Sequence, residues 1–206
     1  MLETATLRYA RHLDEAEAWL GTRGLDLEFA RSEGLGVVRD PLQGHEHLKG
    51  RLCVPYLTDF GPVNMTFRCM EPHSCKEIPD HSKYMFPKGL KTNLYGVQSI
   101  DAADEWIVMT EGEIDRLTWV QLGVPALGVS GAKKWQPHWA NVIEDFSTLY
   151  FIEDGDRDGR ELFEKVSYEV DQAKTQVIRV RMPDGEDTNS MYIKRGRDYL
   201  MERIGK

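Results

Sequence analysis

Acidic side chains gather at three places in the second half of the sequence. These runs are residues 110–115, 153–158 and 183–187, and each of them contains a glycine beside or between its acids. A glycine permits a tight turn, so that neighbouring carboxylates can point toward a common centre. Oxygen ligands arranged in this way are what Mg²⁺ or Mn²⁺ requires. The runs therefore predict a site for a hard divalent cation.

Predicted strands and helices alternate from residue 104 to the end, and each acidic run directly follows a strand. The predicted strands are 106–110, 126–129, 148–152 and 176–180, and the predicted helices are 113–122, 136–145, 158–173 and 189–204. Such alternation is typical of a three-layer α/β domain with a mainly parallel sheet. Sites in these domains form beyond the carboxyl ends of the strands, which is where the acids stand.

The acids also have a simpler explanation. Glu113, Asp115 and Asp158 fall in the first turns of predicted helices, where a negative charge complements the helix dipole. A calcium-binding EF-hand loop starting at Asp154 is excluded, because its twelfth position is Lys165 instead of glutamate. Capping accounts less well for acidic runs at the ends of three of the four predicted strands.

Residues 1–103 predict a smaller, mixed α+β subdomain. Two short helices, 14–21 and 26–33, are expected to open it, followed by a hairpin of strands 51–57 and 63–68 and an irregular stretch 69–93. The net charge of the chain is −8, yet residues 41–100 are mildly basic and 101–170 strongly acidic. An acidic centre beside a basic flank suits a metal site next to a polyanion, and ordinary solvated charge is the alternative.

Three cysteines argue against a disulfide framework in a chain that has no recognisable export signal. Cys53 lies within a predicted strand and is interpreted as a packing residue. The remaining two are close to histidines, in the set Cys69, His73, Cys75 and His81. These side chains suffice for a structural zinc ion, although their spacing matches no common zinc finger. Loop residues without a metal are the alternative.

The order of the motifs resembles the Toprim domain of topoisomerases and primases. It comprises Thr-Glu-Gly-Glu-Ile-Asp at 110–115, Gly-Val-Pro-Ala-Leu-Gly-Val-Ser-Gly-Ala at 123–132 and Phe-Ile-Glu-Asp-Gly-Asp-Arg-Asp-Gly-Arg at 151–160. Pro-Asp-Gly-Glu-Asp at 183–187 narrows the resemblance to DnaG-type bacterial and phage primases. Arg-Leu-Cys-Val-Pro-Tyr at 51–56 and Leu-Tyr-Gly at 94–96 resemble the basic subdomain that precedes Toprim there. The resemblance implies a Toprim domain at 104–206 preceded by that subdomain at 1–103.

The same resemblance implies roles for individual residues. The catalytic residues, which would also be metal ligands, are Glu111, Asp154 and Asp156. Further metal ligands would be Asp115, Asp158 and Asp187. Nucleotide and template would be bound by Arg51, Arg68, Lys83 and Tyr84. One position departs from the family, because Asn189 stands where several DnaG-type primases have a second aspartate.

The resemblance further implies a DNA primase core that makes short RNA primers on single-stranded DNA from ribonucleoside triphosphates with Mg²⁺ or Mn²⁺. No phosphate-binding P-loop motif or zinc-binding module of the usual kind is present, so a replicative helicase and a template-recognition module are expected in trans. No apolar run is long enough to span a membrane, and we expect a phage-encoded protein of the bacterial host cytoplasm. A Toprim-type nuclease and a non-catalytic nucleic-acid-binding subunit are the alternatives.

Overall fold

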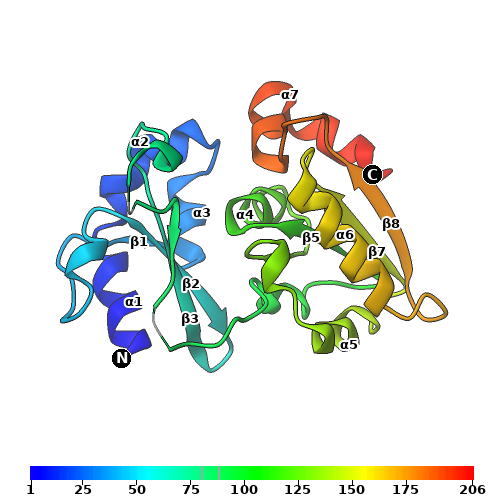
Figure 1. Cartoon of the computed structure of the whole chain (residues 1–206), viewed down its shortest axis with the longest axis horizontal. Coiled ribbons are helices and arrows are strands. Elements are labelled where there is room, and N and C mark those ends of the chain that lie inside the picture. Colours follow the sequence, from blue (N-terminus) through cyan, green and yellow to red (C-terminus); the bar gives the residue numbers. More distant parts are fainter. Residues whose placement is uncertain (80, 88) are drawn as a thin grey trace. The chain divides into compact units, whose positions relative to one another are not determined.

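The computed structural model describes residues 1–79, 81–87 and 89–206. By its internal contacts the chain divides into two compact units, Met1–Asn93 and Leu94–Lys206 (Figure 1). The domain limits suggested by the sequence, 1–103 and 104–206, stay a prediction. No helix in the described ranges has the length and apolar character needed to cross a membrane.

The first unit is built on an antiparallel sheet. Its elements are α1 (Leu2–Ala10), the 3₁₀ turn Leu13–Ala16, α2 (Glu17–Thr22), α3 (Leu27–Ser32), β1 (Gly36–Val37), the 3₁₀ turn Glu46–Leu48, β2 (Leu52–Thr58), β3 (Gly61–Arg68), the 3₁₀ turn Cys75–Glu77 and β4 (Tyr84–Met85). In the described part of this unit the strands run in the order β1-β2-β3-β4. The predicted hairpin is confirmed as β2 and β3, and Asp26 caps α3 by accepting from the Phe29 amide.

Helix α1 packs on this sheet through Ala5 and Tyr9, which are buried together with Cys53 and Phe67. The backbone of α1 approaches Gly36 so closely that a Cβ there would lie 2.2 Å from a Tyr9 backbone carbon. The expectation that two helices open the fold was wrong, because α1 precedes them. The apolar residues of α1 are few and are interrupted by Thr4 and Thr6. The helix is therefore stabilised by packing on a sheet whose strands come much later in the sequence.

The second unit, described in full, contains a parallel sheet. Its elements are the 3₁₀ turn Val97–Ser99, β5 (Trp106–Glu111), α4 (Glu113–Gln121), β6 (Ala126–Val129), the 3₁₀ turns Ala132–Lys134 and Pro137–Trp139, α5 (Ala140–Ile143), β7 (Thr148–Glu153), α6 (Arg157–Glu169), β8 (Gln176–Arg181) and α7 (Thr188–Arg203). The strands run in the order β6-β5-β7-β8, and all of them are parallel.

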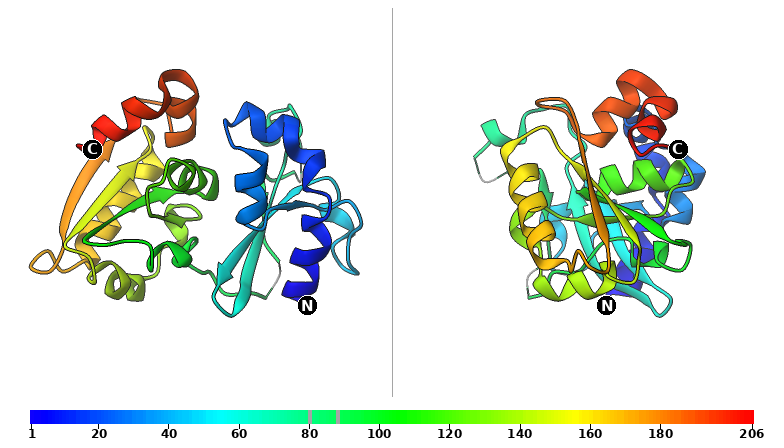
Figure 2. Two further views of the ribbon diagram at one scale, coloured as in Figure 1. Left: turned by 180° about the vertical axis from the view of Figure 1, so that it is seen from behind. Right: turned by 90° about the vertical axis from the view of Figure 1, so that its right-hand side faces the viewer.

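Two apolar layers cover the two faces of this sheet. Ile107 and Met109 of β5 pack with residues of α5 and α6, whereas Val108 between them packs with α4 and α7. Figure 2 shows α6 on one side of the sheet and α4 and α7 on the other. The α/β class and the three-layer arrangement predicted from the sequence are confirmed.

Three local predictions need correction. The expected helix 136–145 is a 3₁₀ turn followed by the single turn α5, since Pro137 starts a tight turn and Trp139 is drawn into the core beside Trp135. The expected helix 158–173 ends at Glu169, because Val170 is extended and buried. The stretch 69–93, expected to be irregular, contains a 3₁₀ turn and β4; positions 80 and 88 of it lie outside the described residues.

Candidate active site at the strand ends

Glu111 is the last residue of β5, the strand next to the centre of the parallel sheet. Its Oε1 accepts a hydrogen bond of 3.2 Å from the Ala132 amide, in the turn that follows the neighbouring strand β6. Gly112 has a φ of 106°, a conformation that suits glycine, and starts α4 immediately after Glu111. The Glu111 side chain is therefore held at the carboxyl edge of the sheet.

Asp154 and Asp156 follow β7, which pairs with β5. Asp156 is the N-cap of α6 and accepts a hydrogen bond of 2.9 Å from the Gly159 amide. Gly155, between the two aspartates, lies so close to the next acidic loop that a Cβ on it would be 1.8 Å from the Pro183 carbonyl oxygen. The sequence places a glycine at the one position of this loop where no side chain fits.

Two main-chain hydrogen bonds join this loop to the one after β8. The Gly155 amide donates to the Glu186 carbonyl, and the Gly185 amide donates to the Gly155 carbonyl, each at 2.8 Å. Asp187 then caps α7, accepting from the Ser190 amide at 2.7 Å in a capping box. The loops after β7 and β8 are in this way fixed to each other.

Asp115 and Asn189 connect the starts of α4 and α7. Asp115 Oδ1 accepts a hydrogen bond of 2.9 Å from the Asn189 amide, and the Asn189 side-chain nitrogen donates to the Thr118 hydroxyl at 3.0 Å. Both residues are buried. Asn189, the departure from the family pattern, thus has a packing role beside the acids.

Mutual repulsion and burial show that these acids share one site. Burial and then the charges of Asp156 and Asp158 raise the pKa of Glu111 to about 7. Burial, followed by the charges of Asp115, Asp187, Glu111 and Asp156, raises the pKa of Asp154 far above its ordinary value. Asp158 is exposed in the first turn of α6 and is the outermost of the group.

The site also contains acceptor atoms without a donor. Oε2 of Glu111 and Oδ1 of Asp154 are buried and have no hydrogen-bond partner among the described residues. Leaving a buried carboxylate oxygen unpaired is costly unless a cation or a proton compensates it. All the side-chain atoms available as metal ligands here are carboxylate oxygens, which suit Mg²⁺ or Mn²⁺.

Known proteins resemble this chain in sequence. A family described as Toprim-like matches residues 108–192. The gene 57 protein of Mycobacterium phage D29 is 35% identical over 122 residues, which cover 59% of this chain and 78% of the phage protein. The chain is a member of the Toprim family. Toprim domains use divalent metals.

Solved structures identify the fold of the whole described chain as that of a DnaG primase catalytic core. The zinc-binding and RNA polymerase domains of Aquifex aeolicus primase match with a TM-score of 0.81 and 19% identity, over 98% of this chain and 59% of that one. A DnaG catalytic domain bound to single-stranded DNA matches with a TM-score of 0.74 and 19% identity, over 98% and 78%. The chain thus spans little more than half of the Aquifex protein.

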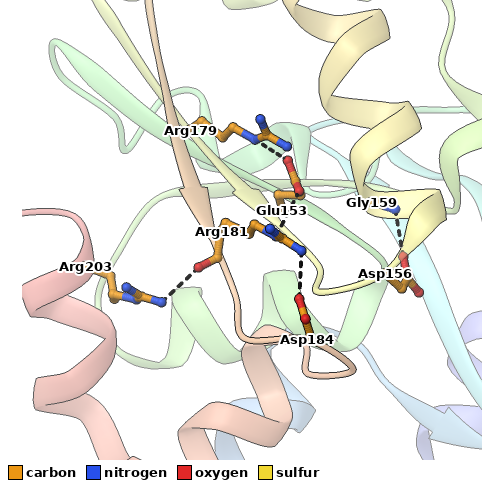
Figure 3. Close-up of polar contacts among 7 residues, drawn as sticks. All are labelled: Glu153, Asp156, Gly159, Arg179, Arg181, Asp184 and Arg203. Atoms are coloured by element: carbon orange, nitrogen blue, oxygen red, sulfur yellow. Dashed lines mark hydrogen bonds and ion pairs between the residues drawn. The ribbon is translucent and has the colours of Figure 1, made fainter.

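An ion-pair network around the buried Glu153 of the Toprim unit was not anticipated from the sequence. Glu153, the last residue of β7, is 1% exposed and pairs with Arg179 and, at 3.6 Å, with Arg181 of β8. Arg181 also binds Asp184 at 2.7 Å, and Arg203 of α7 donates to the Arg181 carbonyl (Figure 3). This network could have been predicted from Arg179 and Arg181, because residues two apart on a strand face the same side of the sheet. They lie on the strand next to the one that ends in Glu153.

The basic residues predicted to bind nucleic acid all lie in the first unit. Arg68 is 6% exposed, and its guanidinium lies 4.8 Å from the Tyr84 ring centre and 5.8 Å from that of Trp19. Lys83 lies 5.9 Å from the Tyr84 ring centre. Arg51 is buried and donates to the Phe67 and Ser82 carbonyls, so its contacts here are structural.

Arg68 and Lys83 line an open pocket of about 590 Å³ within this unit. Trp19 and Arg23 form part of the same pocket. The Nε of Arg68 is buried and makes no hydrogen bond to the described residues. Two further cations and an aromatic ring around a guanidinium whose Nε makes no hydrogen bond suit an anionic, ring-containing ligand.

Proposed function

We propose that this chain is the RNA-polymerising core of a DNA primase, which joins ribonucleotides on a single-stranded DNA template with Mg²⁺ or Mn²⁺. The observation that carries the proposal is the convergence of Glu111, Asp154 and Asp156 at adjacent strand ends, with unpaired buried oxygens, within a DnaG-type core fold. The basic pocket of the first unit and the single-stranded DNA bound to a solved DnaG domain support the template assignment.

Asp154 and Asp156 would hold the cation, which when bound neutralises the triphosphate and so lowers the barrier to phosphoryl transfer. Asp154 contributes a buried oxygen without a competing donor. Asp156 gives one oxygen to the α6 cap, which fixes the direction of its carboxylate. Because the helix holds Asp156, its second oxygen is oriented before a nucleotide arrives.

Glu111 would accept the proton of the attacking 3′-hydroxyl or hold a second cation. A carboxylate with a pKa of about 7 is a far better base near neutral pH than one with an ordinary pKa. The Ala132 amide restrains one of its oxygens and leaves Oε2 for the reaction. A second cation would instead lower this pKa, so the two roles differ in their pH dependence.

Further ligand roles are proposed for Asp115, Asp158 and Asp187. Asp115 and Asp187 are each bonded to an amide in the first turn of α7, and they surround Asp154 with negative charge. Arg68 and Lys83 would contact phosphates, and Tyr84 would stack with a base. Arg51 would act indirectly, through the carbonyls that it binds. A replicative helicase and a template-recognition module are further proposed partners.

The deciding experiment is incorporation of labelled ribonucleotides on a single-stranded DNA template by the purified chain, with a nuclease assay on the same preparation. We expect template-dependent RNA synthesis that requires Mg²⁺ or Mn²⁺ and is abolished in Asp156→Asn. The matched control is Asp198→Asn, an exposed acid of α7 far along the helix from its capping residue, which should leave synthesis unchanged. Template cleavage without synthesis would indicate the nuclease, and binding without either activity an accessory subunit.

A further inference from the structure

Four potential zinc ligands come together in the first unit, whereas the Toprim acids belong to the second unit. Cys69 directly follows β3, Cys75 begins a 3₁₀ turn, and His73 and His81 belong to the adjoining loops. One ligand atom from each residue lies within 4.8 Å of all the others. His73 Nε2 and His81 Nε2 are 3.0 Å apart, and Cys69 Sγ lies 3.6 Å from the first nitrogen and 3.2 Å from the second.

The three printed separations, 3.0, 3.2 and 3.6 Å, are close to those between the ligand atoms of a tetrahedral zinc site. With zinc–sulfur and zinc–nitrogen bonds of the usual length, ligand atoms at tetrahedral angles are about 3.3 to 3.8 Å apart. Two thiolates and two neutral imidazoles also balance the charge of Zn²⁺, so the site adds no net charge to a pocket lined by arginine and lysine. Sulfur and nitrogen donors distinguish this cluster from the oxygen site of the Toprim unit and select zinc over magnesium.

The course of the chain gives a second, independent reason for a cross-link. The segment from Cys69 to Lys83 leaves the sheet and returns to it: the Cys69 amide donates to the Lys83 carbonyl at 2.9 Å, and Arg68 pairs with Tyr84 between β3 and β4. Among the described side chains of 70–83, none is buried in the hydrophobic core. A two-residue strand is a weak anchor for such an excursion, whereas a metal that closes the loop restricts it strongly.

We propose that Cys69, His73, Cys75 and His81 bind one structural zinc ion, which fixes segment 69–83 and with it one wall of the basic pocket. The four residues line the same pocket as Arg68 and Lys83. Arg51 supports the arrangement by donating to the Ser82 carbonyl at 2.9 Å, next to His81. The proposal stands whether or not the chain makes primers, because it concerns the metal and the fold of the first unit.

Metal analysis of the whole purified chain tests the proposal. After expression with zinc and dialysis against metal-free buffer, we expect one zinc per chain, and replacement by Co²⁺ should give the absorption of a tetrahedral, thiolate-bound ion. Cys75→Ser and His73→Ala should each weaken zinc binding by more than the roughly 10- to 100-fold that follows loss of an outer-shell partner. The matched controls are Cys53→Ala in the core and His47→Ala on the surface, which should retain the metal.

The wild-type measurements make the outcome independent of whether a variant folds. A wild-type chain that binds zinc no more tightly than Cys75→Ser, or whose cobalt spectrum lacks thiolate bands, would overturn the proposal. Retention of the metal by both Cys75→Ser and His73→Ala would also overturn it. Chelation should lower the melting temperature of wild type and leave that of Cys75→Ser unchanged, because only wild type has zinc to lose.

Discussion

Glu111 joins three properties in one side chain: a strand-end position, a restrained Oε1 and a raised pKa. Glu111→Gln keeps the size and the hydrogen bond from Ala132 but removes the charge. We expect nucleotidyl transfer to fall by at least about 10²-fold while nucleotide binding persists, since losing a general base has an effect of this size. Steady-state rates and nucleotide titrations measure the two quantities separately.

Glu169→Gln is the matched control, because Glu169 is exposed at the end of α6. It should leave both the rate and the melting temperature unchanged. A normal rate for Glu111→Gln, together with a slightly lower melting temperature, would mean that Glu111 only stabilises the start of α4. The assignment of a catalytic role would then be wrong.

The raised pKa of Asp154 predicts a pH effect on the metal-free chain. The pKa of Asp154 is higher in the folded state than in the unfolded state. As pH rises above the unfolded pKa, the unfolded chain therefore loses this proton more readily than the folded chain does. The contribution of Asp154 to the free energy of unfolding then decreases. Asp154→Asn removes this cost. In a chelator the variant should melt above wild type, by a margin that grows from pH 5 to pH 8, values that lie above the ordinary pKa of aspartate of about 4.

Added Mg²⁺ should reverse this order. The cation raises the melting temperature of wild type, since it binds the folded state, and raises that of Asp154→Asn much less. Thermal melts at both pH values, with and without Mg²⁺, test both parts. A margin that is flat or that shrinks with pH would show that Asp154 ionises freely in the folded chain.

Among the elements, the loops after β7 and β8 depend on each other through Gly155. In Gly155→Ala the added Cβ would meet the Pro183 carbonyl oxygen, which is backbone and cannot rotate away. We expect a loss of stability of about 1–3 kcal/mol, the usual cost of overpacking, and a loss of synthesis as Asp154 is displaced. Denaturant unfolding and the incorporation assay measure these effects.

Gly21→Ala provides the comparison, because a Cβ at Gly21 meets no atom within 4 Å. As an alanine in helix α2, it should keep or slightly raise the stability, and it should leave synthesis unchanged. Equal behaviour of the two alanine variants would mean that the two acidic loops move apart at little cost.

The elements of the Toprim unit were predictable because β5, β6 and β7 are largely buried and the helices have distinct starts. Runs such as Trp106–Glu111 and Thr148–Glu153 are mostly apolar and end in an acid. Helix α1 escaped prediction, and the segment around α5 was predicted as one long helix, 136–145, since their short apolar patterns gain meaning only when the partner surface is known. Local pattern predicts an element well when the element carries its own burial signal.

The site was predictable in its residue types but not in its contacts. Acids at strand ends identified Glu111 and Asp154 correctly as neighbours, since parallel strands end at one edge. The bond from the Asn189 amide to Asp115 spans 74 residues, and the ion pairs of Glu153 depend on the register between β7 and β8. Neither can be read from spacing along the chain.

At the scale of the whole molecule, a net charge of −8 limits the attraction to DNA. In the proposed template site, phosphate contacts come from a few cations such as Arg68 and Lys83. Each contact with a single strand contributes about −0.7 to the slope of log affinity against log salt. We expect weak binding of a single-stranded oligonucleotide that falls as salt rises. Lys83→Ala should weaken it and make the slope shallower.

Lys49→Ala, at an exposed lysine of the same unit outside the pocket, is the control and should change neither affinity nor slope. Fluorescence anisotropy over a series of salt concentrations measures both. Tight binding that is insensitive to salt, or equal effects of the two lysine variants, would place the nucleic-acid contacts elsewhere in the chain.

The paired hydrogen bonds between Gly155 and the loop after β8 restrict how this region can be re-engineered or diverge. An insertion in either loop would also displace the other loop. Each loop supplies one main-chain donor and one main-chain acceptor to the two hydrogen bonds that join them. If one acidic loop is exchanged for that of a related protein, its main chain no longer fits the hydrogen bonds of the other loop, even when its aspartates are retained. The two loops form a single transplantable module, and they can be replaced together more readily than one at a time.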